Sequence, residues 1–257
     1  MENNSSHYSN SAKRILNILK TLNNQPGNLS AAKVWAQTLG LESDNIEEDT
    51  HEIHKKLGLL RTELDLVEMQ MMNTSFSKEL YLPYIKDLKK IFSPSNILAE
   101  WNSYSQHING TNLLMLGYCS EILADEDSID FEELENLLSK LHEFKSAIEN
   151  SNINNASNNF IINQINIIQQ AINDYPISGN KVLINSFDKG IMEIIKNQEL
   201  ISEPENKNHT NKMLDIFNEF REVTKNITDI DKTVSSCLGL INKGSALLEI
   251  IGKNLLN

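Results

Sequence analysis

The feature that most constrains the fold is a row of apolar residues near the C-terminus. These residues recur at alternating steps of three and four, and Gly244 is the one position that is not apolar. Such steps are typical of a helix that packs along another helix in a heptad repeat. We call this row the heptad seam: Met213, Ile216, Phe220, Val223, Ile227, Ile230, Val234, Cys237, Ile241, Gly244, Leu248, Ile251 and Leu255.

The length of the seam limits what the helix can pack against. A continuous helix from Lys212 to Leu256 would be near 65 Å long at roughly 1.5 Å per residue, which exceeds the width of a small bundle. It must therefore lie along another long helix of this chain or pair with another chain. The internal candidate is a helix expected over 45–73, where apolar residues follow the same rhythm from Ile53 to Met71. That helix is shorter, which would leave part of the seam for a partner.

Three glycines leave two interpretations of this helix open. Gly239, Gly244 and Gly252 lie within it, and each glycine weakens a helix by about 1 kcal/mol relative to alanine. Either the helix bends or breaks near 239–244, or the glycines allow another backbone to approach closely. The bend is the favoured interpretation.

The remaining sequence also predicts helices. Alternating polar and apolar runs, which are typical of half-buried strands, are missing from it. The predicted fold is therefore all-α: an antiparallel helical bundle with a long C-terminal heptad (coiled-coil-like) helix. Before that helix, the expected helices cover 11–22, 29–39, 45–73, 84–92, 95–108, 112–124, a segment capped by Asp130, 160–172 and 182–200.

Breaks in the helical pattern predict three regions. Segment 23–28 contains Pro and Gly and separates two short helices, and the polar segment 202–209 is the best linker candidate. We expect an N-terminal helical hairpin over 1–42 and a helical bundle core over 43–206. A C-terminal heptad helix over 207–257 would pack on the bundle or on a partner.

Segment 151–173 is unusual because it contains no charged residue. Ile161, Ile165, Ile168 and Ile172 would share one helical face, and further isoleucines lie outside that face. A helix that is apolar on more than one side is usually buried. We therefore expect a central helix of the bundle here. The alternative is a prion-like Asn/Gln tract, which the isoleucine periodicity disfavours.

The composition excludes several classes of protein. Hydrophobic residues make up 40% of the chain, which is too many for a disordered chain. Acidic residues outnumber basic ones by 35 to 23, so we expect no nucleic-acid partner, since phosphate contacts depend on Lys and Arg. No apolar run is long enough to predict a membrane span. The N-terminal sequence lacks the pattern of a signal peptide, which predicts a cytoplasmic protein.

The sequence offers weak candidates for a metal site. Glu48 and His51 form an E-x-x-H step, and His54 follows one turn later. Di-iron bundles need two such steps and two further glutamates, and this sequence has one. The H-E-x-x-H zinc signature is absent as well. A solvated acidic face at the start of a helix is the simpler interpretation, so we assign no metal ligand and no cofactor.

Motifs of catalysis and of phosphate loops are missing too. There is no G-x-S-x-G elbow and no glycine-rich phosphate loop in the sequence. Cys119 has no histidine near it in sequence, and we expect it to be a buried structural residue, although a partner distant in sequence is possible. Segment 30–40 distantly resembles a helix-turn-helix, but the acidic residues after it would repel phosphate. We therefore assign no catalytic residue.

These observations favour a non-catalytic interaction or assembly protein of a bacterial cytoplasmic system. The seam would bind a protein partner or a second copy of the chain. One alternative is a regulatory or effector component of a bacterial antiphage defence or toxin–immunity system. Others are an enzyme with a site assembled from distant residues, and a surface-bound membrane helix over 234–256, which lacks the usual basic face. The candidate interaction residues are Ile216, Phe220, Val223, Ile227, Ile230, Val234, Ile241, Leu248 and Ile251.

Overall fold

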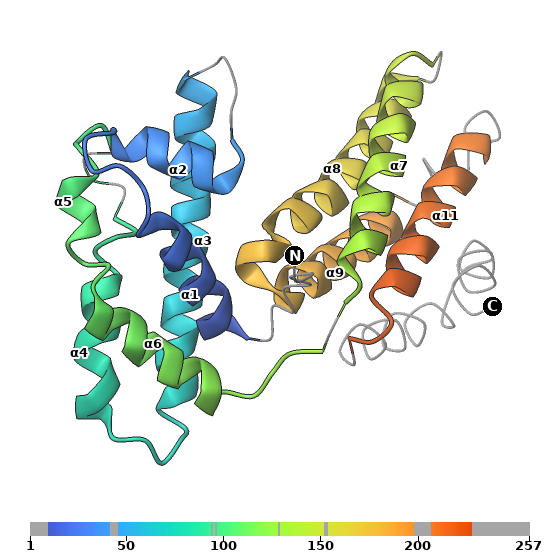
Figure 1. Cartoon of the computed structure of the whole chain (residues 1–257). Helices are drawn as coiled ribbons and strands as arrows, with labels where there is room; N and C mark the ends of the chain where they lie inside the picture. The colour runs from blue at the N-terminus through green and yellow to red at the C-terminus, as the bar shows by residue number, and fades with distance from the viewer. Residues whose placement is uncertain are drawn as a thin grey trace. The chain divides into compact units, whose positions relative to one another are not determined.

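The computed structural model shows a helical protein (Figure 1). It describes residues 10–41, 46–93, 95, 97–127, 129–151, 154–197 and 207–227. Every element assigned within these ranges is an α-helix, and the one β-bridge joins Ser30 to Glu100. The predicted all-α class is therefore confirmed.

The chain divides into two compact units. Unit 1 comprises residues 1–126 together with 176–179, and unit 2 comprises 127–175 and 180–257. This division falls inside the region 43–206, and the three regions expected from the sequence stay a prediction. The short segment 176–179 belongs to unit 1 by its contacts, although the chain on both sides of it belongs to unit 2.

Unit 1 is built around its first helix. Helix α1 contacts α2, α3 and α6, and α4 packs on α6 (Figure 1). The side chains of α1 from Ala12 to Leu22 fill the centre of the unit. The helices are α1 (Ser11–Leu22), α2 (Ala31–Leu39), α3 (Ile46–Met71), α4 (Lys78–Leu88), α5 (Asn102–Ser105) and α6 (Gly110–Ile122).

The apolar rhythm predicted for 45–73 corresponds to the buried face of α3. The six residues of this rhythm are each at most 1% exposed: Ile53, Leu57, Leu60, Leu64, Val67 and Met71. They pack in one core with Trp35 and Trp101, whose rings meet edge to face at 5.9 Å. The heptad rhythm of α3 is therefore explained by packing inside unit 1.

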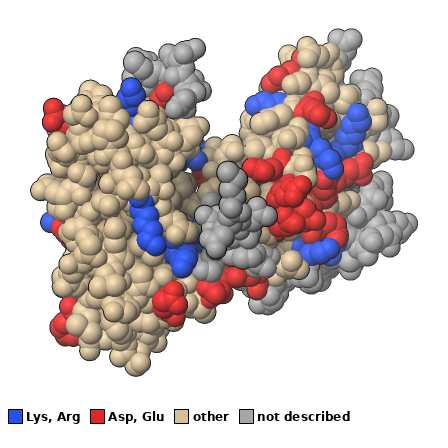
Figure 2. Space-filling model, viewed as in Figure 1, with Lys and Arg blue, Asp and Glu red and all other residues tan. Residues whose placement is uncertain are grey.

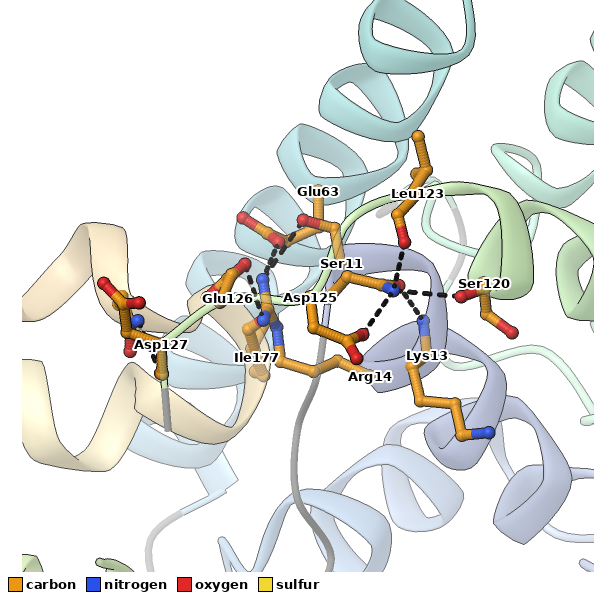
Figure 3. Close-up of polar contacts among 12 residues, drawn as sticks. Ser11, Lys13, Arg14, Glu63, Ser120, Leu123, Asp125, Glu126, Asp127 and Ile177 are labelled. Carbon is orange, nitrogen blue, oxygen red and sulfur yellow. Dashed lines mark hydrogen bonds and ion pairs between the residues drawn. The ribbon is translucent and has the colours of Figure 1, made fainter. Parts of the chain in front are cut away.

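Asn10 joins the start of α1 to the end of α6. Its Oδ1 accepts a hydrogen bond from the backbone N–H of Lys13, which is the usual role of an N-cap residue. Its Nδ2 donates to the backbone carbonyls of Ser120 and Leu123 (Figure 3). Helix ends leave unpaired N–H and C=O groups, and one buried amide here satisfies groups at two ends.

The helix predicted over 95–108 is largely absent, because α5 covers Asn102–Ser105 alone. The residues before it form turns and a single β-bridge, and they pair with the segment that leads into α2. Ala31 and Ala32 donate backbone hydrogen bonds to the carbonyls of Ala99 and Ile97, and Trp101 donates to Leu29. These long-range hydrogen bonds outweigh the local helical signal of Ser93-Pro94.

Unit 2 contains α7 (Phe131–Glu149), α8 (Asn155–Ser178), α9 (Asn180–Lys196) and α11 (Lys207–Val223). Asp130 caps α7 as predicted, because its side chain accepts a hydrogen bond from the backbone N–H of Glu132. Helix α11 packs on α7 (Figure 1). In the core of the unit, Phe187 contacts both Phe217 and Phe220.

The uncharged segment forms most of α8. The four isoleucines predicted to share a face, Ile161, Ile165, Ile168 and Ile172, are each at most 3% exposed. The helix extends beyond the predicted range 160–172 at both ends, contains Pro176 and stops at Ser178. Gly179 then adopts a left-handed conformation with φ of 59°, which is a common way to terminate a helix.

The C-terminal helix ends earlier than the heptad seam predicts. Helix α11 stops at Val223, and residues 224–226 form a turn. The Thr224 hydroxyl donates back to the carbonyl of Phe220, and the backbone N–H of Ile227 donates to the carbonyl of Thr224. A single helix over 212–256 is therefore interrupted after Val223, before the glycines where we expected a bend. Residues 228–257 lie outside the described part of the chain.

The two units differ in the surface that each presents. Figure 2 shows few charged side chains on the visible face of unit 1 and a mixture of acidic and basic side chains on that of unit 2. An ion pair on unit 2 joins Lys140 of α7 to Glu219 of α11. Across the ranges that the structure describes, no helix combines the length and apolar character needed to cross a membrane.

Candidate functional site

The described part of the heptad seam packs inside unit 2. Phe220 is fully buried, Val223 and Ile227 are 8% and 3% exposed, and Ile216 is half-buried. These side chains fill the core that α11 shares with its neighbours. The other candidate interaction residues lie outside the described residues: Ile230, Val234, Ile241, Leu248 and Ile251. An interaction through the seam stays a prediction, and it concerns the part beyond Ile227.

A second apolar row lies on the surface of α6. Leu114, Tyr118 and Ile122 are spaced by one helical turn and are 60%, 49% and 38% exposed. The opposite side of the same helix is buried through Leu116 and Cys119. This row is an exposed apolar patch on unit 1, and such patches often mark interaction surfaces.

The weak candidate for a metal site, the segment with Glu48, His51 and His54, lies at the start of α3. The side chains of His51 and His54 are exposed to solvent, and that of Glu48 lies outside the description. No group of three or more His, Cys, Asp or Glu side chains gathers at a metal-binding distance among the residues described here.

Cys119 is fully buried in the core of unit 1. Burial raises the pKa of its thiol to about 11, because the charged thiolate is disfavoured away from water. The thiolate is the reactive form of cysteine, so this thiol is unreactive at neutral pH. The expectation of a buried residue is confirmed, and Cys237 lies outside the described chain.

The most highly charged interior site is formed around Arg14 (Figure 3). The Arg14 side chain is fully buried, and its Nη2 lies 2.7 Å from Oε2 of Glu63, which is itself 2% exposed. Its Nη1 lies 2.8 Å from Glu126 in an ion pair without hydrogen-bond geometry, and its Nε donates to the carbonyl of Ile177. Nη2 also donates to the Ser11 hydroxyl. A buried charge is tolerated when it is paired in this way.

Gly179 completes the surroundings of Arg14. A β-carbon at this position would lie 2.4 Å from Nη1 of Arg14 and 2.3 Å from Oε2 of Glu126. Only glycine combines that space with the left-handed backbone found here. The cluster therefore connects α1, α3, residue 126 and the turn after α8 within unit 1, and its role is structural.

The described site best suited to binding is a basic pocket of unit 1, with a volume of about 610 Å³. It is formed by the second half of α3, the end of α4, the segment after it, and α5. Four of its side chains carry positive charge and none carries negative charge, in a chain of net charge −12. The basic pocket is lined by Arg61, Lys86, Lys89, Lys90, Ser93, Ser95, Ala99, Ser103, Tyr104 and His107.

Carboxylates outside the lining hold two of these lysines. Lys89 Nζ lies 2.5 Å from both Asp65 and Glu68 of α3. Desolvation by itself lowers the pKa of Lys89, but the hydrogen bonds to Asp65 and Glu68 outweigh it, so the pKa is raised. Lys90 lies 2.9 Å from Asp87 of the preceding turn. Lys89 is therefore held by two carboxylates of α3, whereas Lys90 forms an exposed ion pair at the surface.

Asp87 is the central acceptor beside the pocket. It accepts from Lys90, from Nδ1 of His107 at 3.0 Å and from the amide of Asn112 at 2.9 Å. Burial by itself raises the pKa of Asp87, but these hydrogen bonds outweigh it and lower the pKa to about 2. Asp87 is therefore a carboxylate at any physiological pH and fixes the position of His107.

The sequence did not reveal this pocket. Its lining residues extend from 61 to 107, and the one local signal is three lysines within five residues at the end of α4 and just after it. Ala99 lies in the segment 97–101, where we predicted a helix, and it also lines the pocket. A smaller groove of about 390 Å³ on unit 2 contrasts with it, because amides of α8 and α9 such as Asn163, Asn166 and Asn185 line that groove.

Comparison with known proteins adds nothing to this geometry: no protein family, curated protein or solved structure matches the chain.

Proposed function

We propose that this chain is a non-catalytic interaction and assembly protein, and that the seam beyond Ile227 binds a second copy of the chain. The observation that carries the proposal is the continuation of the same three- and four-residue steps from Ile230 to Leu255. Unbroken heptad spacing over that length is typical of a helix that needs a partner helix.

The packing of α11 supports this proposal. In α11 the same spacing places Phe220 and Val223 in the helix–helix core of unit 2. The seam positions are therefore the ones that this chain uses for packing helices. Helix α11 ends at Val223 and a turn follows at 224–226, and the apolar row continues in the sequence from Ile230 onward.

Point variants of the full chain test the proposal. We expect light scattering coupled to size-exclusion chromatography to give at least twice the 29.2 kDa of one chain. Val234→Asp, which places a charge in the seam, should return the mass to that of one chain. Ser236→Asp adds the same charge two residues away and outside the seam, so it should leave the mass unchanged.

Two further variants separate folding from assembly. Ile227→Asp introduces a charge at a buried position of unit 2, and we expect it to lower the melting temperature. Tyr118→Asp acts on the exposed row of α6. If Tyr118→Asp dissociates the oligomer and Val234→Asp does not, assembly uses α6 and the proposal is wrong. A single-chain mass for the unaltered protein at high concentration would also overturn it.

Truncation before α11 is unsuitable for this test. A chain that ends near Glu203 lacks Phe217 and Phe220, which are buried to 1% and 0% exposure in unit 2. Such a chain loses a large part of that core whether or not the seam has a partner. Substitutions beyond Ile227 retain α11 and its buried phenylalanines, and the melting temperature of each variant separates a loss of folding from a loss of assembly.

A further inference from the structure

We propose that the basic pocket of unit 1 binds the phosphate group of a small phosphorylated molecule. This proposal is independent of the assembly proposed above, because it rests on a different unit of the chain. Its first support is the gathering of Arg61, Lys86, Lys89 and Lys90 around one cavity without an acidic side chain in the lining.

Two of these cations retain capacity for a ligand. Lys86 forms no hydrogen bond or ion pair with any described residue. Arg61 has one weak interaction, in which Nη1 lies 3.4 Å from the carbonyl oxygen of Lys89. Its other guanidinium N–H groups can donate to a ligand, and the planar guanidinium can donate two hydrogen bonds to two oxygens of one phosphate. Lys86 and Arg61 are therefore the residues that we expect to contact the ligand directly.

The other two cations are arranged in advance. Lys89 and Lys90 are held by carboxylates that do not line the pocket: Asp65, Glu68 and Asp87. These carboxylates offset part of the positive charge, but Asp65 and Glu68 hold the ammonium group of Lys89 in one position, where it is 16% exposed. A site whose groups are already fixed loses less conformational entropy when a ligand binds.

Hydroxyl groups add donors of the kind that suits a phosphate. Ser93 and Ser95 share one hydrogen bond at 2.8 Å between their Oγ atoms, which leaves one hydroxyl hydrogen for a ligand. The Tyr104 hydroxyl donates to the Ser95 carbonyl and Ser103 donates to the Glu100 carbonyl, so these two groups shape the site without supplying a donor. A tetrahedral dianion can accept from several such groups at once.

The size and surroundings of the pocket favour a small ligand over a nucleic acid. Its volume of about 610 Å³ falls within the ~300–1,000 Å³ typical of small-molecule sites, and it exceeds what a lone phosphate ion fills. The net charge of −12 opposes a long polyanion, whose binding depends on many basic contacts along its length. A single phosphate on a compact molecule meets the positive charge only where it is concentrated.

The first experiment measures the melting temperature of the full chain in inorganic phosphate and in chloride of equal ionic strength. A ligand that binds the folded state raises the melting temperature in a saturable way. We expect a saturable rise for the unaltered chain and for Lys33→Gln, an exposed position on α2. Lys86→Gln and Arg61→Gln should each weaken the binding about tenfold or more, the usual effect of losing one hydrogen bond to a charged group.

These variants also exclude the general effect of phosphate as a salt. Phosphate stabilises many proteins by exclusion from their surface, and that effect would be equal in all four proteins. An equal rise in Lys86→Gln, in Arg61→Gln and in the unaltered chain therefore overturns the proposal, as does the absence of any saturable rise.

A second experiment asks whether binding depends on the phosphate group or on the rest of the ligand. Isothermal titration with ribose 5-phosphate should give saturable heat, and titration with ribose should give none. Heat from ribose alone would contradict phosphate recognition. Binding of a single-stranded oligonucleotide that excess ribose 5-phosphate does not displace would mean that an extended surface binds polyanions, which also overturns the proposal.

Discussion

The two units bury polar side chains in opposite ways. In unit 1, Arg14 is fully buried and each of its three nitrogens is within 3.0 Å of an oxygen partner. In unit 2, Gln164 is also fully buried, yet both atoms of its amide lack a hydrogen-bond partner. A buried charge without partners is far more costly than a buried neutral amide, so the comparison shows which defect a core can tolerate.

This difference predicts that replacing Arg14 and replacing Gln164 by an apolar residue change the stability in opposite directions. Removing the charge from unit 1 leaves carboxylates without their partner. Removing the amide from unit 2 leaves nothing unpaired, because the amide had no partner to lose. The predictions below test this comparison, beginning with the largest expected effect.

Replacing Arg14 by methionine should destabilise the protein by about 3–5 kcal/mol, the usual effect of breaking a buried ion pair. The main cause is Glu63, which is 2% exposed and would keep a buried negative charge. Urea denaturation measures the loss. Adding Glu63→Gln to Arg14→Met should recover part of it, and Lys13→Met on the same helical turn should change stability little. A small loss in Arg14→Met would show that the cluster does not stabilise unit 1.

Replacing Gln164 by methionine, a residue of similar length, should stabilise the protein by about 1–3 kcal/mol. That range is the desolvation penalty of one buried unsatisfied polar group. Thermal and urea denaturation both measure it. Gln170 on the same helix donates to Asp174 at 2.8 Å, so Gln170→Met should give no such gain. Destabilisation by Gln164→Met would mean that the amide is satisfied in solution.

Replacing one helical glycine of each unit by alanine should change the stability in opposite directions. A β-carbon at Gly190 in α9 would lie 2.5 Å from the ring of Phe217, whereas one at Gly117 in α6 meets nothing closer than 4.0 Å. We expect Gly190→Ala to lower stability by about 1–3 kcal/mol through overpacking. Gly117→Ala should raise it by up to about 1 kcal/mol through helix propensity. Equal effects at the two sites would contradict the close packing of α9 and Phe217.

The smallest expected effect is the dependence of stability on pH at Asp87. Its pKa in the folded chain is about 2, below the value of 3.8 expected without interactions. A lowered folded pKa contributes stability that is complete well above pH 3.8 and is lost as the pH falls toward 2. The stability difference between the unaltered chain and Asp87→Asn should therefore shrink from pH 6 to pH 3. In an Asn112→Ala background the decline should begin at higher pH, and a difference that stays constant would contradict the lowered pKa.

Local patterns predicted much of the fold. The spacing of apolar residues in 11–22 and 45–73 matches α1 and α3 almost to the residue, because these helices bury a continuous face. Asp130 was recognisable as a cap because its hydrogen bond is local. Helix α4 begins at Lys78, before the predicted start at Tyr84, and it contains Pro83, a residue that the pattern treats as a helix breaker.

The parts that sequence analysis missed depend on contacts between distant residues. Segment 97–101 pairs with 29–32, and no local signal reveals that choice. Arg14 meets Glu63 and Glu126 only after α1, α3 and the end of α6 have come together. Arg14 at the centre of unit 1 and Arg61 in the lining of the basic pocket carry no local sequence signal of either role.

Residues 176–179 belong to unit 1 although they follow the first segment of unit 2 in the chain. This arrangement affects the order in which the chain can fold during synthesis. The carbonyl of Ile177 accepts the hydrogen bond from Nε of Arg14, although most of unit 1 is complete at residue 126. A ribosome that has made the first 126 residues has therefore not yet supplied the last acceptor for this guanidinium. Unit 1 reaches its final form only after α8, a helix of the other unit, has been translated.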